Sequence, residues 1–169
     1  MSRRVLVMDT SVLCCWLAIP GKETAGPDED RWDRVRISNL VEKEEKGGST
    51  FVLPLASLIE TGNHIAQSGG DRFKVARDLS DIIIKAADAK TPWAAFTDQA
   101  DLWGSDRLKK LANDWPPLAA ARTSIGDATI KDVAEWYAQA GMSVEIITGD
   151  AGLKAYEPQA PVLQPRRRN

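Results

Sequence analysis

The sequence predicts an α/β fold of three layers, α/β/α, with a central, mainly parallel sheet of four to five strands. Three observations support this prediction. Apolar runs of strand length alternate with longer amphipathic segments along the whole chain. The first run, residues 5–8, is apolar without interruption, as expected of a strand that is buried on both faces. Asp9, Thr10 and Ser11 follow it directly, and these residue types commonly begin helices.

The other elements follow in an order that alternates strand and helix. Apolar runs predict further strands at 50–55 and 143–148, with shorter candidates at 93–96 and 161–163. Between them, helical patterns are expected at 12–19, 32–46, 56–67, 71–90, 98–113, 124–140 and 151–156. Pro116 and Pro117 are expected to end the fifth of these helices, because proline cannot donate the backbone hydrogen bond that a helix interior needs.

Length and composition favour one globular domain. The 169 residues are 43% hydrophobic and 27% charged, which is ordinary for a soluble protein. We assign residues 1–164 to this domain and treat 20–31, which is polar and rich in turn formers, as a mobile loop insertion. Residues 165–169 form a basic tail that is predicted to be disordered.

Several function classes are disfavoured. No apolar run approaches the 18 or more residues of a membrane span, and Arg3 and Arg4 are not followed by a secretory signal. The adjacent Cys14 and Cys15 suit a reduced, cytoplasmic protein. With His64 as its one histidine, the chain offers no Cys/His zinc site and little support for a Ser-His-Asp triad. A net charge of −2 argues against a protein that coats nucleic acid, but it is compatible with an enzyme that contacts a few phosphates.

Four acidic residues occupy comparable places at the ends of predicted strands or in the helices that follow: Asp9, Glu60, Asp127 and Asp150. The carboxyl ends of parallel strands lie at one edge of a sheet, so these side chains are expected to converge there. Four converging carboxylates repel one another, and a hard divalent cation with oxygen ligands relieves that repulsion. A plainer interpretation is also open, because each residue could cap a helix, and Ser124 with Asp127 has the form of a capping box.

In order and spacing, these motifs resemble those of the PIN-domain nucleases. The family's opening strand with Asp-Thr/Ser-Ser is matched by Asp9-Thr-Ser, and its second acid, with Asn three residues later, by Glu60 and Asn63. Its third acid, at the start of a long helix, is matched by Asp127, and its final strand with Thr-x-Asp by Thr148-Gly-Asp150. Compared with the small toxins of this family, the chain is enlarged at 20–31 and 91–118.

The resemblance implies a PIN-like fold and a metal-dependent ribonuclease that hydrolyses phosphodiester bonds. Asp9, Glu60, Asp127 and Asp150 would be the catalytic acids and would hold Mg²⁺ or Mn²⁺. The residues implied to orient these acids are Thr10, Ser11, Asn63 and Thr148. The partners implied are an RNA substrate, an antitoxin protein and a second copy of the chain, and the role could be that of a toxin, a defence nuclease or an RNA-processing nuclease.

Two other functions stay open at this point. One is a degenerate PIN scaffold that binds RNA or a protein without catalysis. The other is a phosphohydrolase of the haloacid dehalogenase type, whose nucleophilic aspartate is normally followed two residues later by a second aspartate. Ser11 stands at that position here, which disfavours the phosphohydrolase.

Overall fold

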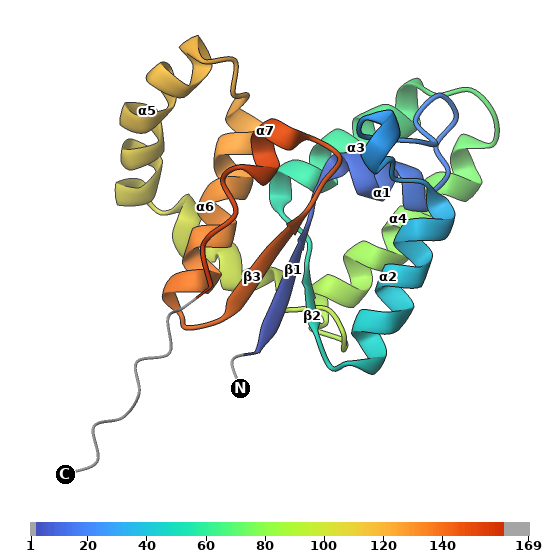
Figure 1. The fold of residues 1–169 in the computed structure, drawn as a ribbon, viewed down its shortest axis with the longest axis horizontal. Coiled ribbons are helices and arrows are strands. Elements are labelled where there is room, and N and C mark those ends of the chain that lie inside the picture. Colours follow the sequence, from blue (N-terminus) through green and yellow to red (C-terminus); the bar gives the residue numbers. More distant parts are fainter. Residues whose placement is uncertain (1–2, 161–169) are drawn as a thin grey trace.

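Three parallel strands form the centre of the protein (Figure 1). The computed structural model describes residues 3–160, and within them β1 (Arg4–Met8) lies between β2 (Thr50–Val52) and β3 (Ser143–Ile147). Both neighbours pair with β1 in parallel. The predicted α/β class with a parallel sheet is therefore confirmed, but the described sheet has three strands rather than four to five.

Helices account for most of the remaining described residues. They are α1 (Thr10–Trp16), α2 (Arg34–Lys46), α3 (Leu55–Gln67), α4 (Arg72–Ala87), α5 (Ser105–Ala120), α6 (Ile125–Gln139) and α7 (Ala151–Lys154), with the 3₁₀ helices η1 (Asp28–Asp30) and η2 (Phe96–Trp103). Between residues 3 and 160, no helix is both long and apolar enough to cross a membrane.

Alternating residues of β1 pack into two different cores. Leu6 and Met8 pack with side chains of α1, α2 and α4 on one face of the sheet. Val5 and Val7 face the other way, into a core built mainly with α6. A strand covered by helices on both faces must be apolar at every position, and this explains the uninterrupted apolar run in the sequence.

The predicted strand at 93–96 is reduced to one bridge. Trp93 makes an isolated parallel bridge with Phe51, supported by the hydrogen bond from the Ala94 amide to the Phe51 carbonyl at 2.9 Å. The chain turns into η2 at Phe96 before a second bridge can form. Trp93 instead anchors packing, because its ring stacks on Trp16 and lies against Phe51. The candidate strand at 161–163 and the tail at 165–169 lie outside the described residues.

The predicted helix break at the two prolines is wrong. α5 continues through Pro116 and Pro117 to Ala120. Proline's fixed φ angle is compatible with a helix, and its cost arises from a lost hydrogen bond and a clash with the preceding turn. α5 contains no buried residue, so water can solvate the carbonyl groups that the prolines leave without a helical donor.

The insertion at 20–31 has a defined structure rather than that of an open loop. Ala25 and Trp32 form an antiparallel bridge with two backbone hydrogen bonds, of 3.0 and 2.7 Å. η1 fills the turn between them. Trp32 is 8% exposed and joins the core on the α1/α2 face, so the insertion is attached to the body of the protein.

Candidate functional site

Asp9 ends the central strand and begins the first helix. Its backbone is extended, and its Oδ2 atom accepts a hydrogen bond from the Ser11 amide at the start of α1. Oδ2 also accepts hydrogen bonds from the hydroxyl groups of Ser11 and Thr148, each at 2.7 Å. Asp9 is only 5% exposed, and these three bonds fix the orientation of its carboxylate. The helix-cap interpretation is confirmed, but it does not exclude a second role for the Oδ1 atom.

The turn after β3 extends this hydrogen-bond network to Asp150. The Thr148 hydroxyl donates to Asp9 and accepts from the Asp150 amide at 2.9 Å. The Ser11 hydroxyl similarly accepts from the Gly149 amide at 3.0 Å. The two hydroxyl groups therefore link the carboxyl ends of β1 and β3, which are adjacent in the sheet. Asp150 itself caps α7, where its Oδ1 atom accepts from the amides of Gly152 and Leu153.

Glu60 is held between α1 and α6. Its Oε2 atom accepts a hydrogen bond of 3.0 Å from the Thr10 hydroxyl. A Cβ atom at Gly126 would lie 2.6 Å from the Oε1 atom of Glu60. The Glu60 carboxylate thus occupies space that a larger residue at position 126 would fill, and the glycine lets it lie directly against the first turn of α6.

Asp127 stands in that first turn. Ser124 caps the helix by accepting a hydrogen bond from the Asp127 amide at 3.0 Å, as the capping-box interpretation predicted. Burial raises the pKa of Asp127 to about 6, and the nearby Asp9 and Asp150 add to the increase, whereas a hydrogen bond with Ser124 opposes it. Asp127 therefore experiences the carboxylate repulsion that the sequence predicted.

All four predicted acids line one pocket of about 300 Å³ at the carboxyl edge of the sheet. Thr10 and Ser11 line it as well, and Thr148 is connected to it through Asp9. Asn63 is exposed and does not line the pocket. His64, one residue further along α3, takes that place.

Besides His64, four residues of the pocket were not predicted from the sequence: Cys14, Lys22, Thr24 and Ala25. The last three come from the insertion, which has no periodicity that could have indicated where it folds. Burial raises the pKa of the Cys14 thiol to about 12, so this side chain is a neutral part of the pocket wall at ordinary pH. Lys22 brings a basic group to the otherwise acidic lining.

Two glycines explain why the insertion can approach the site so closely. A Cβ atom at Gly149 would lie 2.8 Å from the Ala25 Cβ atom and from the Gly26 amide nitrogen. Gly26 has a φ of +86°, which a residue with a side chain rarely adopts. The backbone of the insertion therefore rests on the turn that carries Thr148 and Asp150.

The donor atoms of the pocket are of the kind that binds a hard divalent cation. Its acidic ligand candidates are all carboxylates, and carboxylate oxygens are the protein donors that Mg²⁺ and Mn²⁺ prefer. Asp9 and Asp150 contribute, after burial, to the raised pKa of Asp127, and a cation would offset this contribution. As the side chains stand, no three His, Cys, Asp or Glu residues between positions 3 and 160 form a ready-made metal-binding group. A bound ion would thus require small side-chain movements or bridging waters.

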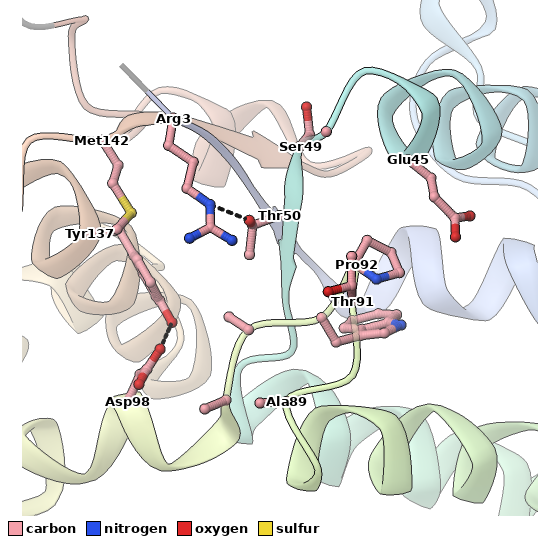
Figure 2. A pocket seen from close by; sticks show the side chains of 14 residues that line it. Arg3, Glu45, Ser49, Thr50, Ala89, Thr91, Pro92, Asp98, Tyr137 and Met142 are labelled. Carbon is pink, nitrogen blue, oxygen red and sulfur yellow. Dashed lines mark hydrogen bonds between the residues drawn. The ribbon is translucent and has the colours of Figure 1, made fainter. Parts of the chain in front are cut away.

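A second cavity lies at the opposite, amino edge of the same sheet. Figure 2 shows Arg3 donating to the Thr50 hydroxyl on one side and Tyr137 donating to Asp98 on the other. The cavity has a volume of about 240 Å³, and Pro92 and Met142 supply part of its wall. Its mixture of single charges with apolar groups differs from the carboxylate pocket.

Comparison of the chain with protein-family models, with curated proteins and with solved structures found no match.

Proposed function

We propose that the protein is a divalent-metal-dependent endoribonuclease with a PIN-like fold. One observation supports the proposal: carboxylates from the end of β1, from α3, from α6 and from the turn before α7 line a single pocket at the carboxyl edge of a parallel sheet. These elements are far apart in the sequence, and helix capping alone does not explain why all four acids meet. Asp9 and Asp150 cap α1 and α7. Glu60 and Asp127 are not helix caps, because Pro54 and Ser124 hold those positions at α3 and α6.

In this proposal Asp9, Glu60, Asp127 and Asp150 hold Mg²⁺ or Mn²⁺. When bound in such a site, a divalent ion lowers the pKa of a coordinated water and offsets negative charge on the phosphate. The protein's own groups prepare the ligands. Ser11 and Thr148 orient Asp9, and Thr10 orients Glu60, at 2.7 to 3.0 Å.

Asp127 gives the proposed site a dependence on pH. With a pKa of about 6, it is partly protonated in mildly acidic solution. A cation binds the ionised carboxylate and therefore has to displace that proton. Metal affinity is expected to rise with pH through about 6 and to level off above it.

The test uses purified protein and a labelled single-stranded RNA. Cleavage is expected with Mn²⁺ or Mg²⁺, and it should be abolished by EDTA and by D127N. D132N is the matched control, because Asp132 lies on the same helix and is also half-buried with a raised pKa, but it does not line the pocket. Cleavage that persists in EDTA, or equal activity in D127N and D132N, would contradict the proposal.

A measurement of metal binding distinguishes a non-catalytic scaffold from a nuclease. Calorimetry with MnCl₂ should show binding to the wild-type protein and weaker binding to D127N. RNA binding without Mn²⁺ binding or cleavage would favour the scaffold. A phospho-aspartate trapped on Asp9 would instead favour the phosphohydrolase.

An antitoxin partner and a homodimer are proposals that rest on the resemblance to PIN-domain toxins. A toxin role predicts that expression of the chain arrests growth and that D9N relieves the arrest. Growth arrest by wild type and D9N alike would exclude RNA cleavage as its cause. Size-exclusion chromatography with light scattering measures the oligomeric state directly.

A further inference from the structure

A larger cavity, of about 470 Å³, adjoins the carboxylate pocket on the other side of the insertion. Asp150 lines both cavities, and Thr148 and Gly149 line the larger one. The contact between Gly26 and Gly149 lies beside this shared boundary. A polymer with one group at the carboxylates could therefore place a neighbouring group in the larger cavity.

One wall of this cavity carries a fixed guanidinium plane. The Arg36 guanidinium carbon lies 3.8 Å from the centre of the Trp32 ring. Its Nη1 atom donates to the Asp30 carboxylate at 2.7 Å and to the Arg31 carbonyl at 3.0 Å. The indole supports one face of the plane, and the Arg36 side chain retains 41% exposure. An arginine held in this way has already lost much of its rotamer freedom, so a ligand that stacks on it incurs less of that entropic cost.

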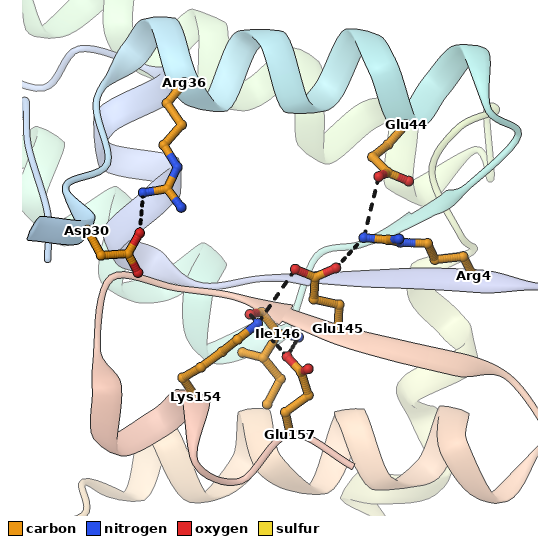
Figure 3. Close-up of polar contacts among 8 residues, drawn as sticks. All are labelled: Arg4, Asp30, Arg36, Glu44, Glu145, Ile146, Lys154 and Glu157. Carbon is orange, nitrogen blue, oxygen red and sulfur yellow. Dashed lines mark hydrogen bonds and ion pairs between the residues drawn. The ribbon is translucent and has the colours of Figure 1, made fainter. Parts of the chain in front are cut away.

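On the opposite wall, polar contacts hold the side chain of Lys154 in place. Figure 3 shows Arg36 extending from α2, paired with Asp30, and Lys154 of α7 lying beside Glu145 of β3. The Lys154 ammonium donates to the Ile146 carbonyl at 3.0 Å and pairs with Glu145 and with Glu157. Its charge is therefore already balanced by carboxylates of its own wall.

The balance of charge decides which part of a nucleotide fits here. Two cations line the cavity, Arg36 and Lys154, against three carboxylates, those of Asp30, Glu145 and Asp150. A phosphate would meet net repulsion in this lining. A neutral nucleobase would not, and it could stack on the guanidinium plane and donate to carboxylate oxygens. Proteins that read single-stranded RNA commonly stack unpaired bases on aromatic rings or arginine planes.

We propose that this cavity is a nucleobase subsite, which receives the base next to the scissile phosphodiester of an RNA substrate on the Arg36 guanidinium. The proposal rests on the proposed nuclease function, since that function places the phosphate at the neighbouring carboxylates. Arg36 is then a substrate-binding residue. It contributes to KM and leaves the hydrolytic step unchanged.

The experiment compares wild type with R36A, R36K and R34A on one fluorescein-labelled single-stranded RNA with MnCl₂. R34A is the matched control, because Arg34 lies on the same helix but lines a different cavity. Loss of a base stack is worth about 1–3 kcal/mol, so R36A is expected to raise KM about tenfold with kcat within about twofold. R36K keeps the charge without the plane and should resemble R36A. R34A should match wild type.

The contact between Arg36 and the base can also be tested by removing the base from the substrate. After the cleavage position has been mapped, an abasic nucleotide is placed at each neighbouring position in turn. One such substrate should raise KM for the wild type but cause no further increase for R36A. Independent, additive effects would overturn the subsite, as would equal KM values for R36A and R34A. Thermal melting of each variant verifies that it is folded, and R36K supplies the comparison if R36A does not fold.

The two proposals can fail separately. If the wild type cleaves RNA and R36A has the same KM as R34A, the proposed nuclease function is supported and the nucleobase subsite is contradicted. If the wild type does not cleave, the proposed function fails, and fluorescence anisotropy of the same RNA still measures whether R36A binds more weakly than R34A. Equal binding by these two variants would then remove the subsite as well.

Discussion

The two edges of the sheet are built from the same three strands and differ sharply in chemistry. At the carboxyl edge, four acids and several hydroxyl groups line one pocket, where burial, with a smaller contribution from the neighbouring acids, raises the pKa of Asp127 to about 6. At the amino edge, the Arg3–Thr50 and Tyr137–Asp98 pairs lie at separate points of the cavity wall. Carboxylates are gathered at the carboxyl edge, whereas at the amino edge Arg3 and Asp98 each have a separate, neutral hydrogen-bond partner. The two edges therefore offer a direct comparison, because the proposed metal site predicts that changes at the carboxyl edge affect RNA cleavage and that changes at the amino edge do not.

The largest effect is expected from D9N. Asparagine can keep the cap and accept from Ser11 and Thr148, but it removes the charge. RNA cleavage should fall by at least about 100-fold, because even groups that only support a metal ligand are worth 10–100-fold. Circular dichroism and the melting temperature should stay close to those of wild type. If D9N still cleaved RNA, the Asp9 carboxylate would not be a catalytic group, and nothing would distinguish the carboxyl edge from the amino edge in function.

T148V should reduce both activity and stability. The variant keeps the side-chain shape but removes the hydroxyl that joins Asp9 to the Asp150 amide. We expect about 10- to 100-fold slower cleavage and about 1–3 kcal/mol lower unfolding free energy, since buried polar groups lose their partners. Urea denaturation and initial rates measure the two effects. Unchanged rates would show that the orientation of Asp9 is not limiting.

G126A should separate activity from stability. The added Cβ atom would lie 2.6 Å from the Glu60 carboxylate, which has to move. Displacement of a positioned group is expected to slow cleavage on the order of tenfold. Alanine favours a helix over glycine by up to about 1 kcal/mol, and the group displaced is the end of a flexible side chain, so the melting temperature should be unchanged or higher. A stable variant with normal cleavage would argue against Glu60 as a ligand.

The metal-free protein should lose stability as pH rises through the range in which Asp127 ionises. The ordinary pKa of this carboxyl is 3.8 and its pKa in the folded protein is about 6. Between these values the folded state binds more protons than the unfolded state, so unfolding free energy falls as pH increases. The expected difference from D127N between pH 4 and 7 is on the order of 1 kcal/mol, because solvent screens a half-buried carboxyl. Chemical denaturation of both proteins in EDTA measures it, and parallel pH profiles would contradict the carboxylate cluster.

The smallest effect is expected at the amino edge. Y137F removes the hydrogen bond of 3.3 Å to Asp98 while keeping the ring packed edge-on against Trp136. The cost should be about 1 kcal/mol of unfolding free energy, with no change in RNA cleavage. Slower cleavage by a stably folded Y137F would show that the two edges are not independent.

Local sequence patterns were sufficient for the central features of the fold. The apolar run before Asp9 predicted a strand that is buried on both faces, and Leu6 and Val7 pack into opposite cores. The predicted convergence of the four acids is also observed. Patterns were less useful where tertiary packing decides. Trp93 makes one bridge instead of a strand, and α5 continues through two prolines because it lies at the surface.

The sequence by itself determined the order of the three strands and of most helices, and the carboxylates at the strand ends, because these follow from local periodicity and from the geometry of parallel sheets. The tertiary structure decided which neighbouring side chains complete the site. His64 rather than Asn63 lines the pocket, and Lys22 reaches it from the insertion. It also decided how the backbone of the insertion rests on Gly149, and how Glu60 lies against Gly126. These contacts join segments more than 60 residues apart, and they depend on side-chain direction and on the absence of a single Cβ atom, neither of which leaves a periodic signal in the chain.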